Sequence, residues 1–325
     1  MSRFFLLIFF IFSLVLCRPA LATTIFSPVL EMTVEPGKTE SGILKVYNET
    51  DFPLTLQASV EAFTAGDESG QPQYLPAAER RDYLNWFKLS SDSLKLNARQ
   101  AAVVPFSVTV PAKALPGGYY AVVFWQSGGL EGQSAVSINS KVGTLVLVRV
   151  TGEVKESGEI VEFGPVVKSD MLFDLPISFT VRFSNIGNIH LAPSGEIEIK
   201  NWLGKKNRLA INAEKRFVLP GSIRRFDAVW SNLTPPPNSW QGFWQKVRAE
   251  IRELAIGKYT ATLHLTYGRD AAAELTREVT FWYWPWRTLI VLLGGGILLR
   301  LLLRIRKKIN IFKQAGKKNH ETKNS

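Results

Sequence analysis

The chain of 325 residues contains 46% hydrophobic residues, which is enough for two folded domains and excludes a largely disordered protein. Its formal net charge of +11 is concentrated in residues 1–22 and 300–325, so the nearly neutral stretch between them lacks the basic face that binds nucleic acid. The single cysteine, Cys17, lies in the N-terminal apolar run, which excludes disulfides, thiolate metal sites and cysteine nucleophiles from the rest of the chain.

Residues 1–22 have the features of a cleavable signal peptide. Arg3 precedes the apolar run FFLLIFFIFSLVL, and Ala20–Ala22 provides an A-x-A cleavage site. We therefore predict cleavage after this site and export of the remaining chain. Two alternatives stay open here: an uncleaved N-terminal anchor, and a lipoprotein acylated at Cys17, although Leu16 stands where a lipoprotein signal has a small residue.

Between residues 25 and 281, apolar and polar residues alternate in several short runs, as in strands with one buried and one solvent-exposed face. Turn-forming pairs such as Pro36-Gly37 separate these runs. Many short strands with close turns favour antiparallel sandwiches over βαβ units. We therefore predict an all-β fold of two tandem immunoglobulin-like β-sandwich domains, residues 23–152 and 153–280, followed by a C-terminal single transmembrane helix.

Residues 240–255 depart from the strand pattern and are predicted to form a helical insertion in the second domain. Apolar residues recur there at helical spacing, and most of the other positions are charged or polar. Either this helix packs on its own sandwich, or it lies in the membrane interface, where two tryptophans would contact lipid. The apolar positions are Trp240, Phe243, Trp244, Val247, Ile251 and Leu254.

The C-terminal region is predicted to cross a membrane once. The apolar run 288–303 spans only about 24 Å as a helix, which is less than the roughly 30 Å hydrocarbon core. We therefore expect the helix to start at Phe281 and to cover residues 281–303. Its predicted membrane-interface residues are Trp282, Trp284, Trp286, Arg300 and Arg304.

The basic tail, residues 304–325, is expected in the cytoplasm, which leaves the ectodomain extracytoplasmic. A wall-sorting signal also ends in an apolar stretch and basic residues. No LPxTG-like motif precedes this helix, so retention in the cell membrane is the better interpretation. The run Gly294–Gly296 is a place where a partner helix could approach closely.

Catalytic motifs are missing from the sequence. It contains no HExxH, GxSxG, P-loop or GxGxxG motif, and nothing in it selects a carboxylate pair for glycoside hydrolysis. His190 and His264 are expected on the surface, because the first follows a turn and the second lies on the polar face of a strand. Asp67 and Glu68 lack the alternating spacing of a calcium loop. We predict a protein that is not an enzyme and uses no metal or cofactor.

Two pairs of segments resemble the WxL-interacting protein family. Residues 34–63, VEPGKTESGILKVYNETDFPLTLQASVEAF, together with residues 85–125 are similar to the family's first domain. Residues 183–206 and 218–230 are similar to its second domain, and the order of signal peptide, two immunoglobulin-like domains, transmembrane helix and basic tail is the same. The resemblance implies peptidoglycan binding by the first domain and binding of host or partner proteins by the second.

The leading hypothesis is a non-catalytic, membrane-anchored protein of the cell envelope. Its β-sandwiches would bind cell-wall polymer or partner proteins at the cell surface, as an adhesin or scaffold. Tyr119 and Trp125 are candidates for stacking on a sugar or protein, unless the run YYAVVFW is a central core strand. The alternative is a membrane-tethered assembly factor or chaperone for secreted surface subunits, which acts by strand pairing.

Overall fold

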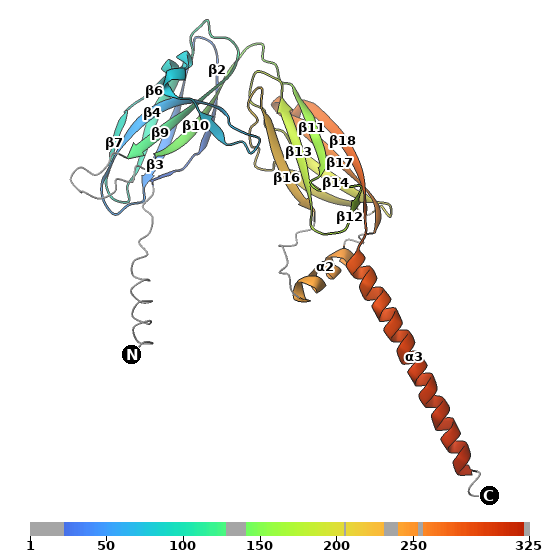
Figure 1. The fold of residues 1–325 in the computed structure, drawn as a ribbon. Coiled ribbons are helices and arrows are strands. Elements are labelled where there is room, and N and C mark those ends of the chain that lie inside the picture. Colours follow the sequence, from blue (N-terminus) through green and yellow to red (C-terminus); the bar gives the residue numbers. More distant parts are fainter. Residues whose placement is uncertain (1–22, 128–140, 205, 231–239, 253–255, 322–325) are drawn as a thin grey trace, which may run out of the picture. The chain divides into compact units, whose positions relative to one another are not determined.

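The computed structural model describes residues 23–127, 141–204, 206–230, 240–252 and 256–321, and these are mostly β-strands (Figure 1). The predicted signal peptide lies outside them and stays a prediction. The chain divides into two compact units. Unit 1 comprises Met1–Gly158, Ser184–Leu191 and Phe217–Arg224, and unit 2 comprises Glu159–Phe183, Ala192–Arg216 and Arg225–Ser325.

Unit 1 contains two sheets. The first has the order β1-β3-β8-β6, formed by β1 (Thr23–Ile25), β3 (Thr39–Asn48), β8 (Ala101–Thr109) and β6 (Phe87–Leu89). The second has the order β2-β10-β9-β4-β5, with β7 also paired to β4; its strands are β2 (Val29–Val34), β10 (Lys141–Val150), β9 (Gly117–Ser127), β4 (Leu54–Ala65), β5 (Pro72–Tyr74) and β7 (Ser93–Leu96). Pairing is antiparallel except between β2 and β10, which run parallel.

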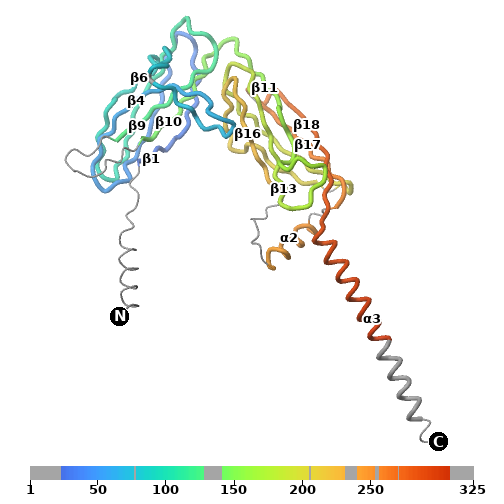
Figure 2. The backbone as a smooth tube through the Cα atoms, in the orientation of Figure 1, coloured from blue at the N-terminus to red at the C-terminus, as the bar shows by residue number. Residues whose placement is uncertain are grey.

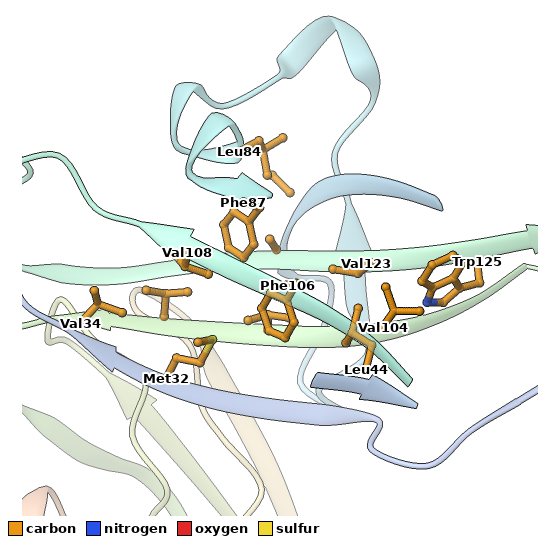
Figure 3. Close-up of a cluster of buried hydrophobic side chains, with 14 of the residues drawn as sticks. Met32, Val34, Leu44, Leu84, Phe87, Val104, Phe106, Val108, Val123 and Trp125 are labelled. Atoms are coloured by element: carbon orange, nitrogen blue, oxygen red, sulfur yellow. The ribbon is translucent and has the colours of Figure 1, made fainter. Parts of the chain in front are cut away.

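The core of unit 1 lies between these sheets (Figure 3). Phe106 and Val108 of β8 meet Val123 and Trp125 of β9 there. The opposite face of β9 is buried as well, because Tyr120, Val122 and Phe124 belong to a second apolar cluster with Phe63 and Leu147. The run YYAVVFW is therefore a central strand covered on both faces, which explains why it lacks the alternation of a half-exposed strand.

Unit 2 also contains two sheets. The first has the order β11-β13-β16, formed by β11 (Gly158–Pro165), β13 (Ile177–Asn185) and β16 (Ile223–Trp230). The second has the order β12-β18-β17-β14-β15, formed by β12 (Met171–Leu172), β18 (Ala273–Tyr283), β17 (Gly257–Tyr267), β14 (Ser194–Asn201) and β15 (Lys206–Ile211). Aromatic rings fill its core: Tyr259 stacks on Phe281 with centroids 5.6 Å apart, and Trp230 lies 5.0 Å from Tyr259.

Two α-helices occur in the described part of the chain, α2 (Trp240–Arg252) and α3 (Trp286–Glu321). Helix α2 occupies most of the residues predicted as a helical insertion, and 253–255 lie outside the described residues. The prediction of a mostly β protein with a C-terminal apolar helix is confirmed.

The predicted start of the transmembrane helix at Phe281 is wrong. Phe281 and Tyr283 are buried residues of β18, where they alternate with exposed neighbours, and α3 begins only at Trp286. The apolar run 288–303 is too short to span a bilayer, and most of the additional helix length comes from residues after 303. The segment Trp286–Lys307 has 22 residues, about 33 Å of helix, and is long and apolar enough to cross a bilayer.

A buried asparagine ends the second long strand of unit 1. Asn48 has no exposed surface, and its Nδ2 donates to the carbonyls of Phe52 and Asn97, each at 2.9 Å. Its Oδ1 accepts from the backbone N–H of Thr50 at 2.9 Å and from the Thr50 hydroxyl at 2.7 Å. The side chain therefore ties the end of β3 to two loops.

The same arrangement recurs at the end of β13. Asn185 is fully buried and donates to the carbonyls of Ile189 (2.7 Å) and Val218 (2.8 Å). Its Oδ1 accepts from the N–H of Gly187 at 2.9 Å. An asparagine can satisfy donors and acceptors at once, which a loop buried at a strand end needs.

We predict that Asn48→Ala lowers the free energy of unfolding by about 3 kcal/mol, because the change leaves buried carbonyls and an N–H without partners. The exposed Ser41→Ala on the same strand should change it by less than about 0.5 kcal/mol. Urea unfolding followed by tryptophan fluorescence measures both. Equal midpoints for the two variants would contradict the assigned role of Asn48.

Candidate functional site

The edge of unit 1 beside β10 is only partly covered. Strand β2 pairs with β10 from Leu145 to Val150. Ahead of β2 the chain crosses to the other sheet, where β1 pairs with β3. Among the described residues, therefore, no strand pairs with Lys141–Thr144 on the side that β2 occupies further along.

Backbone hydrogen bonds show which groups face this open side. The N–H of Leu145 donates to the carbonyl of Pro28 at 2.9 Å, in the direction of β2. The backbone groups of successive residues point to opposite sides of a strand. The N–H and C=O groups of Lys141 and Gly143 therefore point to the same side as those of Leu145, which is the open side. Val142, between them, is only half-buried against the core of unit 1. A strand added here would extend the line of β2 and cover Val142.

The charged side chain at the start of β10 is directed away from this edge. The ammonium of Lys141 reaches across the sheet to Glu61 of β4 (2.8 Å) and lies 3.8 Å from the centre of the Phe124 ring. Gly143 leaves room for two side chains of β9, since a Cβ there would come within 2.7 Å of side-chain atoms of Phe124 and Val122. The only charge on the open segment is thus directed away from it.

The edge of unit 2 beside β18 is also incompletely paired but is guarded. Among the described residues, the partner of this edge is β12, which covers only Trp282 and Tyr283. The rest of the edge carries Glu274 and Glu278, and Arg277 reaches the carbonyl of Ile160 at 3.1 Å from a position where its strand neighbours face the core. Charged and inward-pointing residues are the usual protection of an edge strand. The β10 edge is therefore the more permissive of the two.

A buried polar cluster joins α2 to the start of α3. Glu250 of α2 is 1% exposed, and its carboxylate accepts from the N–H of Thr288 at 2.9 Å and from the Thr288 hydroxyl at 2.6 Å. It also pairs with Arg287 at 3.4 Å, and Arg287 bridges to Asp174 at 2.5 Å. A carboxylate at a helix N-terminus satisfies free N–H groups and the positive end of the helix dipole. The cluster thereby fixes α2 to the first turn of α3.

Three of the five predicted membrane-interface residues, the tryptophans, lie at the passage from β18 to α3, which Figure 1 shows at the end of unit 2. Trp282 is the last residue but one of β18, Trp284 lies between strand and helix, and Trp286 is the first residue of α3. All three side chains are exposed. Arg300 and Arg304 are exposed on α3, inside its apolar segment. The two tryptophans of α2 are exposed as well, Trp240 to 73% and Trp244 to 36%.

Tyr119 and Trp125, the other two predicted binding residues, are less accessible than the tryptophans of α2. Trp125 is fully buried between the sheets of unit 1, so the expectation that it stacks on a ligand is wrong. Tyr119 is half-buried, packs its ring on Tyr83 and Trp86 at 5.3 and 4.6 Å, and donates its hydroxyl to the carbonyl of Leu115. Its ring is therefore already stacked within unit 1.

The prediction that His190 lies on the surface is also wrong. Its ring is buried edge-on against Tyr120 and Phe217, with Nε2 2.9 Å from a carboxylate oxygen of Glu31. This hydrogen bond is the main reason why the pKa of Glu31 lies below its ordinary value. His264 is exposed, as predicted. No group of three or more metal-ligating side chains occurs among the described residues.

Comparison with known proteins gives no family. No family model matches the chain, and no curated protein matches its sequence. Among solved structures, the class 5 fimbriae chaperone CfaA is 11% identical over 79% of this chain and 98% of its own, with a TM-score of 0.39. The Escherichia coli chaperone DraB (12%, 81% and 97%, 0.35) and the Pseudomonas aeruginosa chaperone CupB2 (11%, 78% and 98%, 0.34) are similar to the same degree. These values are too low to assign a family or a function.

We predict that Glu250→Ala loosens α2, because it leaves Arg287 short of a partner and Thr288 without its acceptor. Breaking a buried pair costs about 3 kcal/mol, which corresponds to an increase of up to about a hundredfold in local opening. Trypsin digestion of the detergent-solubilised chain measures this, since α2 contains Lys246, Arg248 and Arg252. Gln245→Ala, at an exposed position of α2, should leave the cleavage rate unchanged. Equal rates in both variants would refute the docking role of Glu250.

We also predict a pH effect at Glu31. Its folded pKa lies below the ordinary value of 4.5, so its contribution to stability is present above that value and is lost as the pH falls through the folded pKa. Glu31→Gln should therefore lower the free energy of unfolding at neutral pH by less than about 1 kcal/mol, because the side chain is half-exposed. The deficit should shrink in urea unfolding at pH 3. A deficit that is constant with pH would contradict this assignment.

Proposed function

We propose that this chain is a non-catalytic, membrane-anchored protein of the cell envelope that binds a partner polypeptide by strand addition at the β10 edge. The observation that carries the proposal is the side of Lys141–Thr144 that no strand of the described residues pairs with, and this side faces the place where β2 would continue. Two immunoglobulin-like sandwiches would form the ectodomain, and α3 would hold it at the membrane with the basic tail in the cytoplasm.

The chemistry of the edge indicates the kind of partner. Backbone groups of Lys141 and Gly143 can pair with any extended segment, so specificity must come from side chains. On one face of β10, Val142 packs against the core of unit 1. On the other face, Leu145 packs against the second apolar cluster, to which Phe124 of the neighbouring strand β9 belongs. A guest strand flanked by apolar groups on both faces would itself be apolar.

Such a strand is normally buried in a finished protein. Apolar strands are exposed in secreted subunits that have not completed their own sheets, and these subunits are prone to aggregate. An anchored protein that pairs with an exposed strand would keep the subunit at the membrane until assembly. This supports the assembly-factor hypothesis over an adhesin that holds a finished ligand.

Peptidoglycan binding, which the resemblance to WxL-interacting proteins implies, is the second candidate function. It predicts retention on cell-wall sacculi rather than on protein. The purified full-length chain in detergent, incubated separately with sacculi and with detergent-solubilised surface proteins of the source cell, distinguishes the two.

We predict retention by surface protein, and loss of that retention in Lys141→Pro. Proline removes the outward N–H at the first residue of β10, where the ladder to β9 does not use it, so the fold should be kept. Lys141→Gln is the matched control: it removes the ion pair with Glu61 but keeps the N–H, and should bind like the wild type. Retention by sacculi alone would favour wall binding, and equal binding by both variants would refute strand addition at this edge.

A further inference from the structure

We propose that α2 makes a second contact with the membrane, through an aromatic foot formed by Trp240, Phe243 and Trp244. The foot would lie in the headgroup region of the leaflet on the side of unit 2 and would prefer anionic lipid. This inference rests on the anchoring part of the proposed function and is independent of strand addition.

The foot is exposed although its rings are packed together. Trp240 stacks on Phe243 with centroids 5.8 Å apart and planes inclined by 12°. Trp244 meets both rings edge-on, each at 5.6 Å. Trp240 is 73% exposed even so. A cluster of large exposed aromatic side chains at one helix end marks an interaction surface rather than a core.

The position of the foot is set by the junction with α3. Glu250 is bonded to Thr288, so α2 is held at the first turn of the membrane helix (Figures 1 and 2). The helix between Glu250 and Trp240 is only about 15 Å long. Beyond Trp286, α3 exposes apolar residues such as Leu292, which mark where the hydrocarbon region must lie. The foot is thus held close to the bilayer surface.

The residue types of this region suit that place. Tryptophan is enriched at membrane interfaces because its ring is apolar and its N–H is polar. Trp284 and Trp286 already lie at the start of α3. The foot therefore places two more tryptophans near the start of α3, where Trp284 and Trp286 already lie.

The charge of α2 favours anionic headgroups. The helix carries the cations Lys246, Arg248 and Arg252 and a single acid, Glu250. The acid is buried and paired with Arg287, whereas Lys246 and Arg248 place positive charge on the helix beside the foot. Basic residues beside an aromatic apolar face are typical of helices that lie on anionic bilayers.

Depth measurements on the full-length chain test the proposal. In a Cys17→Ser background, three single variants each carry an environment-sensitive fluorophore: Gln241→Cys (beside the foot), Leu292→Cys (span) and Glu274→Cys (β18, away from the junction). The protein is reconstituted into vesicles of phosphatidylcholine alone, or of phosphatidylcholine and phosphatidylglycerol in equal parts. Spin-labelled lipids with the nitroxide at the headgroup or in the acyl chain then quench the fluorophores.

We expect headgroup quenching of the 241 label, greater in the anionic vesicles, acyl-chain quenching of the 292 label, and none of the 274 label. Trp240→Ser with Trp244→Ser should reduce quenching at 241 to the level at 274 and leave 292 unchanged. Lys246→Gln with Arg248→Gln should abolish the difference between the two vesicle types.

The outcomes separate the two proposals. A 241 label that no lipid quenches, beside a 292 label that is quenched, would overturn the foot and leave the anchor intact. If the 292 label is unquenched too, the anchoring itself fails. Equal quenching at 241 in both vesicle types would overturn the preference for anionic lipid.

Discussion

The need of every backbone N–H and C=O group for a partner governs this structure from the first strand to the last helix. Within the sheets, β2 and β12 are short parallel strands that cover parts of the outer edges of β10 and β18. At the membrane the same constraint acts more strongly, because lipid offers no hydrogen bonds. Strand β18 has an edge that is mostly unpaired within the described chain, so it cannot enter the bilayer as a strand. In the proposed membrane anchor, the change from strand to helix between Tyr283 and Trp286 would meet this limit.

The buried pair of Glu250 and Arg287 fixes the position of α2 relative to α3 more than it stabilises the fold. Two charges taken out of water gain little net free energy compared with apolar residues of the same size. Apolar surfaces, however, allow a helix to slide or rotate, whereas a carboxylate bonded to the N–H and hydroxyl of Thr288 has one geometry. The cluster therefore fixes the position of α2 along α3, and with it the position of the proposed aromatic foot.

Alternation in the sequence predicted the β architecture because one-sided strands leave a period of two. Alternation gave no guide in strands that are buried on both faces, because apolar residues there do not alternate with polar ones. Trp125 lies in a strand covered on both faces, and nothing in its neighbours reveals which face holds the tryptophan. Phe281 was assigned to the helix since a strand end and a membrane interface share aromatic composition. The role of Glu250 depends on Arg287, which lies in another element, so no local pattern could show it.

The crossing of the N-terminal segment between sheets also has a consequence for the order of folding during synthesis. Strand β2 pairs only with β10, which lies far along the chain, so β2 has no place in its sheet until β10 has been made. Pairings of such long range close late, because the loop between them must be ordered first. Strand β2 leaves the ribosome well before β10 and is therefore among the last strands of unit 1 to dock. Until it does, the outer side of β10 lacks its β2 partner from Leu145 to Val150 as well, so the open edge is longer in the newly made chain than in the folded one.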